Sequence, residues 1–121
     1  MFLPEIGKLE LPPFGSPSSK IAIVGDFSDG FDMQARRPFS GPGGNVLENC
    51  LHTAGLIRGE VYMTNLINTK APVKEKFFDE KKCRFTEEGM DYVKILQAEL
   101  SEVEANIIVA AGPASFAALC S

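Results

Sequence analysis

Apolar and polar positions along the chain change period several times, and each change predicts an element. Residues 20–24 are mostly apolar with β-branched members, which is typical of a buried strand. From Asn45 the apolar residues recur at the spacing of one helix face. That face consists of Leu47, Cys50, Leu51 and Ala54. Gly55 stands where a left-handed C-terminal cap is expected, so the helix is predicted to end there.

A second helix is predicted in the C-terminal half. Thr86 is a candidate N-cap, and Glu87 and Glu88 follow in the first turn, where the helix dipole favours negative charge. The helix is expected to continue to about Glu104. Its predicted buried stripe consists of Met90, Val93, Leu96, Leu100 and Val103.

Two further strands flank this helix. Residues 61–67 and 106–111 are apolar runs of strand length, and Gly112 with Pro113 opens a last helix. Strands and helices therefore alternate three times. Alternation at this spacing predicts a parallel sheet with helices packed on it, so we expect a three-layer α/β/α fold.

Composition divides the chain in two. Residues 1–19 are rich in proline and glycine, which disfavours regular helix and interior strand, so we expect an N-terminal arm. Residues 20–121 form the predicted α/β domain. Three strands make a small sheet. We therefore expect a fragment, truncated before its last strand, in preference to an unusually small α/β unit.

Composition and charge narrow the class of protein. At 121 residues the chain is long enough for one domain. Its net charge of −4 means that a nucleic acid would need a local basic patch. No apolar run approaches a membrane span, and no signal peptide is evident. Three widely spaced cysteines favour a reducing compartment, so we expect a cytoplasmic protein. Cys50 and Cys120 are expected to be packing residues.

Candidate chemistry gathers after the first strand. Gly25 and Asp26 follow the apolar run, at the end of a parallel strand where ligands bind in α/β folds. The segment that follows contains Arg36, Arg37 and Phe39, and then three glycines before the helix. A simple linker would not need a carboxylate, two cations and an aromatic ring that follows a proline. We expect the functional site here.

Several common motifs are excluded. Residues 41–46 have a valine where a dinucleotide fingerprint needs its third glycine, and there is no Gly-Lys-Ser/Thr phosphate loop. His52, the only histidine, lies in the middle of a predicted helix. We expect it to be a surface residue, and neither a catalytic base nor a metal ligand.

Four segments in order resemble a known family. They are Val-Gly-Asp at 24–26, Arg-Pro-Phe-Ser-Gly at 37–41, Val-Tyr-Met-Thr-Asn at 61–65 and Ile-Ile-Val-Ala-Ala-Gly at 107–112. Together they resemble the uracil-DNA glycosylase superfamily, most closely its bacterial and archaeal iron–sulfur branch. The resemblance implies a glycosylase-like fold and DNA repair by base excision: a uracil is flipped out of DNA and its N-glycosidic bond is hydrolysed.

The resemblance also implies roles for residues. Phe39 would stack on the flipped base, and Asn65 would read the uracil edge, because an amide offers a donor and an acceptor. Asp26 would be catalytic, orienting the attacking water or stabilising the cationic sugar. Gly25 and Phe27 would supply backbone close to the base.

Cations near these segments are candidates for phosphate contacts. Arg36 and Arg37 are the first choice, with Lys70, Lys74 and Lys76 as further members of a basic rim. The implied partner is DNA, either uracil-containing or single-stranded, and no membrane partner is expected.

Each assigned role has a simpler alternative. Asp26 after a strand could only cap the next turn, and Phe39 could be a core residue beneath its loop. Asn65 at a strand end could be a local hydrogen-bonding group. The sequence leaves these alternatives open.

The chain also departs from the family pattern. Asp26 stands where the family places a glutamate, and Asp29 or Asp32 are candidates to compensate for its shorter reach. The cluster cysteines are not reproduced: Thr69 stands where one is expected, and Cys83 alone cannot hold a cluster. We therefore expect no metal and no cofactor.

The family's second motif, a histidine-containing loop, would follow Ser121. We therefore expect the isolated chain to be inactive and the remainder of its parent chain to be a partner. An alternative is a catalytically silent DNA-binding or docking module, such as the N-terminal part of a phage DNA polymerase acting in DNA replication. A third possibility is a flavodoxin-like nucleotide binder.

Overall fold

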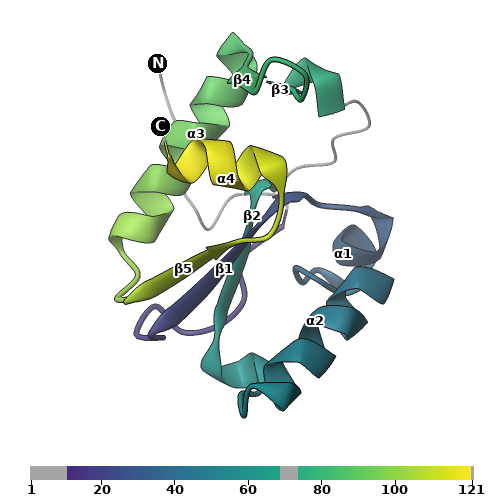
Figure 1. Ribbon diagram of the computed structural model, residues 1–121, viewed down its shortest axis with the longest axis vertical. Coiled ribbons are helices and arrows are strands. Elements are labelled where there is room, and N and C mark those ends of the chain that lie inside the picture. Colours follow the sequence, from purple (N-terminus) through teal and green to yellow (C-terminus); the bar gives the residue numbers. More distant parts are fainter. Residues whose placement is uncertain (1–10, 69–73, 121) are drawn as a thin grey trace.

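The computed structural model describes residues 11–68 and 74–120. Its main sheet consists of three parallel strands in the order β2-β1-β5 (Figure 1). Their bounds are Ile21–Phe27 for β1, Tyr62–Ile67 for β2 and Ile107–Ala110 for β5. The central strand β1 places Val24 opposite Thr64 on one side and Ala110 on the other. The predicted parallel α/β fold is confirmed.

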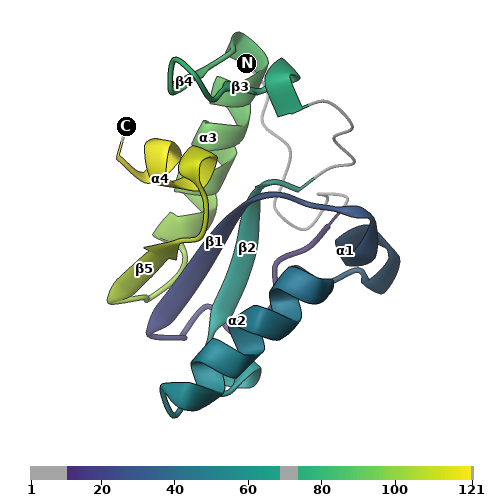
Figure 2. The ribbon, with the colours of Figure 1, turned by 45° about the vertical axis from the view of Figure 1, so that its right-hand side comes forward.

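Helices cover both faces of the sheet (Figure 2). Helix α2 (Pro42–Thr53) packs on one face, and α3 (Glu87–Ser101) with α4 (Pro113–Leu119) packs on the other. The α2 side has a core of Ile23, Leu51, Val61 and Met63. The α3 and α4 side buries Val24, Leu66, Ile67, Phe77, Phe78, Val93, Leu96, Ala114 and Ala118. None of the helices in the described parts of the chain has the length and apolar character of a membrane span.

The described end of the predicted arm is tied to the sheet. Leu11 is fully buried, and its amide donates to the Asn68 carbonyl at 3.0 Å. Phe14 and Met63 exchange two backbone hydrogen bonds of 2.8 Å in an isolated antiparallel bridge. The division of the chain at residue 19 stays a prediction.

Two predicted helix ends are confirmed in detail. The Thr86 hydroxyl accepts a hydrogen bond from the Gly89 amide at 3.1 Å, as an N-cap does. Gly55 adopts a φ of +82° after α2. The Leu56 amide then donates to the Leu51 carbonyl at 2.8 Å, which completes a Schellman motif.

Other boundaries differ from the prediction. Strand β1 continues to Phe27, so Gly25 and Asp26 belong to the strand and not to the loop after it. Helix α2 begins at Pro42, three residues early, because proline is suited to a first turn. Helix α3 ends at Ser101.

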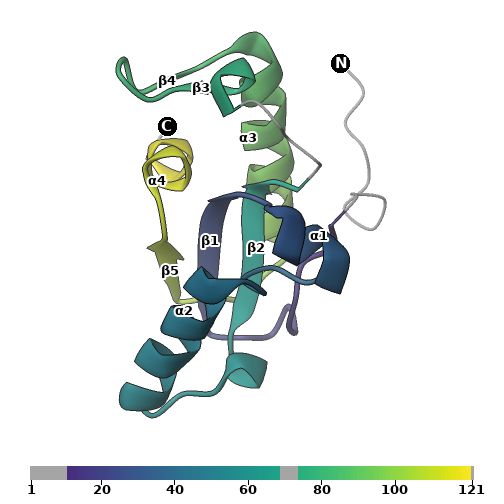
Figure 3. The ribbon, with the colours of Figure 1, turned by 90° about the vertical axis from the view of Figure 1, so that its right-hand side faces the viewer.

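Five short elements were not predicted. Helix α1 (Gly30–Ala35) starts because the Asp29 carboxylate accepts from the Asp32 amide at 2.8 Å. A small antiparallel hairpin pairs β3 (Phe78–Asp79) with β4 (Arg84–Phe85) (Figure 3). Two 3₁₀ turns lie at Arg58–Glu60 and Lys74–Lys76.

The predicted helix stripes were partly wrong. Cys50 and Cys120, expected to be packing residues, are exposed. Val93 and Leu96 of the predicted stripe are buried, but Met90 is 38% exposed and the unpredicted Glu99 is buried beside them. The buried face was predicted from the spacing of apolar residues alone, and that spacing cannot identify a buried glutamate.

Strand β5 is an edge strand of the sheet in the described part of the chain, and three of its side chains are exposed. It pairs with β1 on one side, and the described residues place no strand on its other side. Ile107, Ile108 and Val109 are 56%, 44% and 43% exposed. Strands of parallel sheets are ordinarily buried on both faces, so β5 departs from that pattern.

Glu99 forms a polar contact inside the core between α3 and β2. The Tyr62 hydroxyl donates to Glu99 Oε2 at 2.6 Å, and the Thr64 hydroxyl donates to Oε1 at 3.1 Å. Burial raises the pKa of the Glu99 carboxyl, and the two donated hydrogen bonds oppose this shift. The folded chain therefore binds a proton at Glu99 more tightly than the unfolded chain does.

We predict that Glu99→Gln becomes more favourable as pH rises. A raised folded-state pKa contributes stability that is complete below the unfolded-state pKa of about 4.3 and is lost as pH rises through the folded-state pKa. Glutamine does not titrate. The free energy of unfolding of Glu99→Gln, relative to the parent, should increase in urea titrations as pH rises above about 4.3. Exposed Glu102→Gln is the matched control. Parallel pH profiles for the parent and Glu99→Gln would contradict this assignment.

Candidate functional site

A cleft of about 680 Å³ opens at the carboxyl ends of β1 and β2. Its walls come from the end of β1, from β2, from the segment leading into α2, and from the start of α4. It is lined by five of the predicted site residues, namely Gly25, Asp26, Phe27, Phe39 and Asn65. Residues far apart in sequence meet here because parallel strands end at the same edge of a sheet.

Gly25 lets the ring of Phe39 and the amide of Asn65 come together. A Cβ at position 25 would lie 2.2 Å from Asn65 Oδ1 and 2.9 Å from Phe39 Cζ. Real Cβ atoms do not approach other atoms this closely. The absence of a side chain on β1 therefore makes room for both groups on the cleft wall.

The backbone at Phe39 is left-handed, with φ of +56°. A residue other than glycine held there costs on the order of 1–3 kcal/mol, so its surroundings must hold it. Pro38 restricts φ before it, and a Cβ on Gly44 would lie 1.8 Å from the Phe39 carbonyl oxygen. The half-buried ring packs beside the α2-side core and also lines the cleft. The two alternatives for Phe39, core residue and site residue, are thus compatible in position.

Asn65 has a fixed backbone and a loosely bonded amide. The backbone carbonyl of Asn65 accepts from Asn68 Nδ2 at 2.6 Å, and the backbone N–H of Asn65 donates to Asn68 Oδ1 at 3.3 Å. The side-chain Nδ2 lies 3.4 Å from both Ser28 Oγ and Asp32 Oδ2. These distances exceed the usual 2.7–3.2 Å, so the amide keeps capacity for a shorter hydrogen bond to a ligand.

Asp32 is a buried carboxyl among the cleft-lining residues, only 5% exposed. Its Oδ1 accepts from the Ser40 amide at 2.9 Å. Burial raises the pKa of the Asp32 carboxyl, the nearby Asp29 adds to the rise, and the Ser40 N–H opposes it. Asp32 thus links the segment that presents Phe39 to the amide of Asn65. Sequence reasoning named it only as a substitute for the shortened acid.

Asp26 is bonded to the start of α4. Its Oδ1 accepts from the Ser115 amide at 2.7 Å, and its Oδ2 accepts from the Ala114 amide at 3.1 Å. Gly112 permits this approach, because a Cβ there would lie 2.4 Å from Asp26 Oδ2. Asp26 is therefore a cap, although of a helix 88 residues away and not of the next turn. The same half-buried residue lines the cleft.

Of the described cations predicted to contact phosphates, one lines the cleft and the others do not. Arg36 and Arg37 are exposed between α1 and α2 and are not cleft-lining residues, and the Arg37 guanidinium lies 5.5 Å from the Phe14 ring centroid. Lys74 lines the cleft, with its Nζ 5.5 Å from the Phe27 ring centroid. Lys76 pairs with Glu88 at 3.6 Å. Lys70 lies outside the described residues.

The side chains do not fit an iron–sulfur cluster. The chain has three cysteines, and a cluster of this kind is held by four thiolates. Cys50 lies on α2, whereas Cys120 follows α4 on the opposite face of the sheet, and Cys83 lies between β3 and β4. The described residues contain no group of three histidine, cysteine or acidic side chains placed to hold a metal ion. Thr69, where a cysteine was expected, lies outside them.

Comparison with known proteins agrees with the resemblance. The family model for the uracil DNA glycosylase superfamily matches residues 12–121. A type-4 uracil-DNA glycosylase from Pyrobaculum aerophilum is 32% identical over 65 residues. The match covers 54% of this chain and 33% of that relative, so the chain spans about a third of the relative's length.

We predict that Asp26 contributes to stability as a cap. Asp26→Ala should lower the free energy of unfolding by about 0.5–2 kcal/mol, because two amides of α4 lose their acceptor. Asp26→Asn keeps one acceptor oxygen and should lose less. Urea titration of both variants measures the difference. An Asp26→Ala chain as stable as its parent would show that the bonds to α4 contribute nothing.

Proposed function

The chain belongs to the uracil-DNA glycosylase superfamily, and we propose that its cleft binds a uracil flipped out of DNA. The observation that supports this most is the joint lining of one cleft by the Phe39 ring, the Asn65 amide and the Asp26 carboxylate. Its volume of about 680 Å³ lies within the range of small-molecule sites. Enzymes of flipped bases use such pockets, with an aromatic face and edge-directed hydrogen bonds.

Phe39 and Asn65 divide the recognition of the base. The Phe39 ring offers a flat apolar face, and its backbone is held so that the face stays at the cleft wall. The Asn65 amide presents a donor and an acceptor, which match the N3–H and carbonyl oxygen of uracil. Cytosine presents an unprotonated N3 at the same place, so it leaves one of these hydrogen bonds unmade.

Asp26 acts on the sugar. Hydrolysis breaks the C1′–N1 bond, and the electron pair leaves with uracil. The oxygen of a water molecule bonds to C1′, and the proton that this water loses neutralises the uracil anion. The sugar is oxocarbenium-like in between, and a nearby carboxylate stabilises that positive charge or orients the water. The two α4 amides fix the position of the Asp26 carboxylate, and a fixed group needs no reorganisation during the reaction.

Contacts to the DNA backbone come from a few local cations. Lys74 lies on the cleft wall, and Arg36 and Arg37 are exposed on the segment that leads to Phe39. Because the net charge is −4, these cations act as a local patch and not through the overall field.

A further part of a longer parent protein completes the site. Strand β5 leaves three apolar side chains uncovered, and the chain spans about a third of the relative it matches. We propose that additional polypeptide packs on β5 and supplies the missing catalytic group, and that the 121-residue chain alone binds DNA but does not hydrolyse it. A cytoplasmic location is part of the same proposal.

The preference for uracil tests this function. We expect the chain to bind a single-stranded oligonucleotide containing one deoxyuridine more tightly than the deoxycytidine equivalent, measured by fluorescence anisotropy at fixed salt. Asn65→Ala should reduce that preference roughly tenfold, because a pair of hydrogen bonds is lost. Phe39→Ala should weaken binding of the uracil oligonucleotide. Asn49→Ala, an exposed asparagine on α2, is the matched control.

The alternatives give different results. Equal, salt-dependent binding of both oligonucleotides, unchanged by Asn65→Ala, would replace this proposal with a catalytically silent DNA-binding module, for which the use of Asp26 as a cap is the structural argument. Saturable binding of a free nucleotide without DNA binding would favour a flavodoxin-like binder.

The exposure of β5 gives a separate prediction. In the longer parent protein, Val109→Lys should lower the free energy of unfolding by roughly 1–3 kcal/mol, because a lysine would be buried beneath the added polypeptide. In the 121-residue chain the same change should have little effect, since Val109 is already 43% exposed. Val46→Lys, at a position 63% exposed on α2, is the control. Equal effects in both proteins would argue against coverage of β5.

A further inference from the structure

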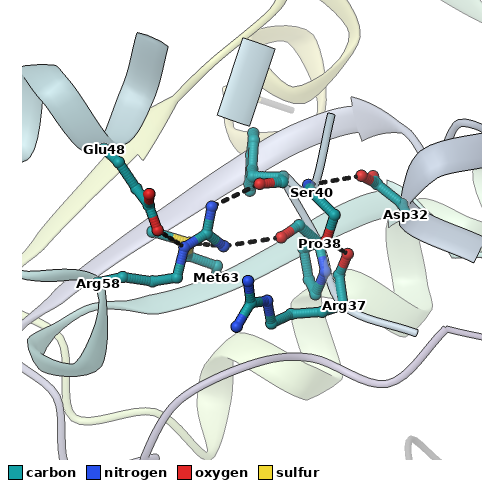
Figure 4. Close-up of polar contacts among 8 residues, drawn as sticks. Asp32, Arg37, Pro38, Ser40, Glu48, Arg58 and Met63 are labelled. Carbon is teal, nitrogen blue, oxygen red and sulfur yellow. Dashed lines mark hydrogen bonds and ion pairs between the residues drawn. The ribbon is translucent and has the colours of Figure 1, made fainter. Parts of the chain in front are cut away.

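We propose that Arg58 is the positioning residue for the base-stacking ring of Phe39. Arg58 lies in the 3₁₀ turn before β2 and is not a cleft-lining residue, so it acts through Phe39. The inference rests on the proposed function, because it concerns how the stacking ring is kept in place. Figure 4 shows the Arg58 guanidinium between Glu48 and the segment that contains Pro38 and Ser40.

Both terminal nitrogens of Arg58 donate to consecutive backbone carbonyls. Nη1 donates to the Pro38 carbonyl at 2.9 Å (Figure 4), and Nη2 donates to the Phe39 carbonyl. A guanidinium has its donors in a rigid fork and can satisfy two acceptors at once. The two carbonyls belong to the peptides on either side of the Phe39 α-carbon, where the backbone is left-handed. Arg58 therefore holds both peptide planes whose orientation sets the direction of the ring.

The guanidinium is itself fixed from the other side. Its Nε donates to Glu48 Oε1 at 2.6 Å, and the Arg58 side chain is only 10% exposed. The Arg58 guanidinium lowers the pKa of the Glu48 carboxyl through this hydrogen bond and its charge. Glu48 belongs to α2, so the ion pair connects the helix beside the cleft to the backbone that presents Phe39.

Other residues around Phe39 contribute to its position in different ways from Arg58. Gly25 and Gly44 provide space beside the ring and the carbonyl, which allows the position but does not select it. Asp32 holds the next residue through the Ser40 amide at 2.9 Å. The Ser40 amide belongs to the same peptide as the Phe39 carbonyl, so Asp32 holds that peptide at its N–H and Arg58 holds it at its C=O. Arg58 is the described side chain that bonds both the Pro38 and the Phe39 carbonyl.

A tryptophan at position 39 provides the test, because the chain contains no other tryptophan. In the Phe39→Trp chain, acrylamide quenching reports the exposure of the ring, and the deoxyuridine oligonucleotide reports its contact with the base. Adding Arg58→Ala or Arg58→Lys should raise the quenching constant about twofold. It should also weaken binding of the oligonucleotide about tenfold. Arg84→Ala, at an exposed arginine in β4, should leave both unchanged.

Arg58→Lys separates positioning from a general stabilising role. Lysine retains the charge beside Glu48 but has one compact ammonium and no fork. If Arg58 only stabilises the fold through its charge, Arg58→Lys restores quenching and binding to the parent values, and the proposal is overturned. If it positions the ring, Arg58→Lys behaves as Arg58→Ala in both measurements while urea titration shows a folded chain.

The outcomes also separate this inference from the proposed function. Arg58-dependent quenching without uracil-dependent binding would retain the positioning role and remove base stacking. If Phe39→Trp does not fold, the same Arg58 variants are compared with Phe39 intact by their preference for the deoxyuridine oligonucleotide. A preference unchanged from the parent in Arg58→Ala would then overturn the positioning role.

Discussion

The left-handed backbone at Phe39 is the constraint on which the cleft depends. A ring in that conformation is presented only if the neighbouring peptides are held, and side chains from two other elements hold them. Arg58 bonds the carbonyls of Pro38 and Phe39, and Asp32 bonds the Ser40 amide, while Gly44 leaves the space in which α2 approaches. The position of the Phe39 ring is thus a product of tertiary structure, and its short segment would not keep this geometry alone.

Buried carboxyls occur on both faces of the sheet, with different consequences. Glu99 lies in the α3-side core and satisfies the hydroxyls of Tyr62 and Thr64, so its raised pKa bears on stability alone. Asp32 lines the cleft and accepts from the Asn65 amide, so its raised pKa bears on the candidate site. In both, burial is the main cause of the shift. The effect of the raised pKa depends on whether the carboxyl is hydrogen-bonded to a cleft-lining group, as Asp32 is to Asn65.

Local patterns predicted the main strands and helices, and the family resemblance added Asn65 and Phe27 to the residues expected at the cleft. The apolar run of β1, the cap at Thr86 and the turn at Gly55 each follow from neighbouring residues. The meeting of strand ends places Gly25 and Asn65 together. Distant pairings were not predictable, because no periodicity connects Asp26 to α4 or Arg58 to the Phe39 carbonyl. The exposed Cys50 and Met90 show a further limit: apolar spacing does not reveal which positions the neighbouring elements leave uncovered.

The bond between Asp26 and α4 links the chemistry of the cleft to the uncovered side of the sheet. Helix α4 follows β5 directly, and its Phe116 is 62% exposed. Since the α4 amides fix the Asp26 carboxylate, a displacement of α4 would move the carboxylate as well. Polypeptide that packs on β5 and α4 would therefore restrict the proposed catalytic group even without touching it. The proposed loss of activity in the isolated chain then has two physical causes, a missing catalytic group and a less restricted carboxylate.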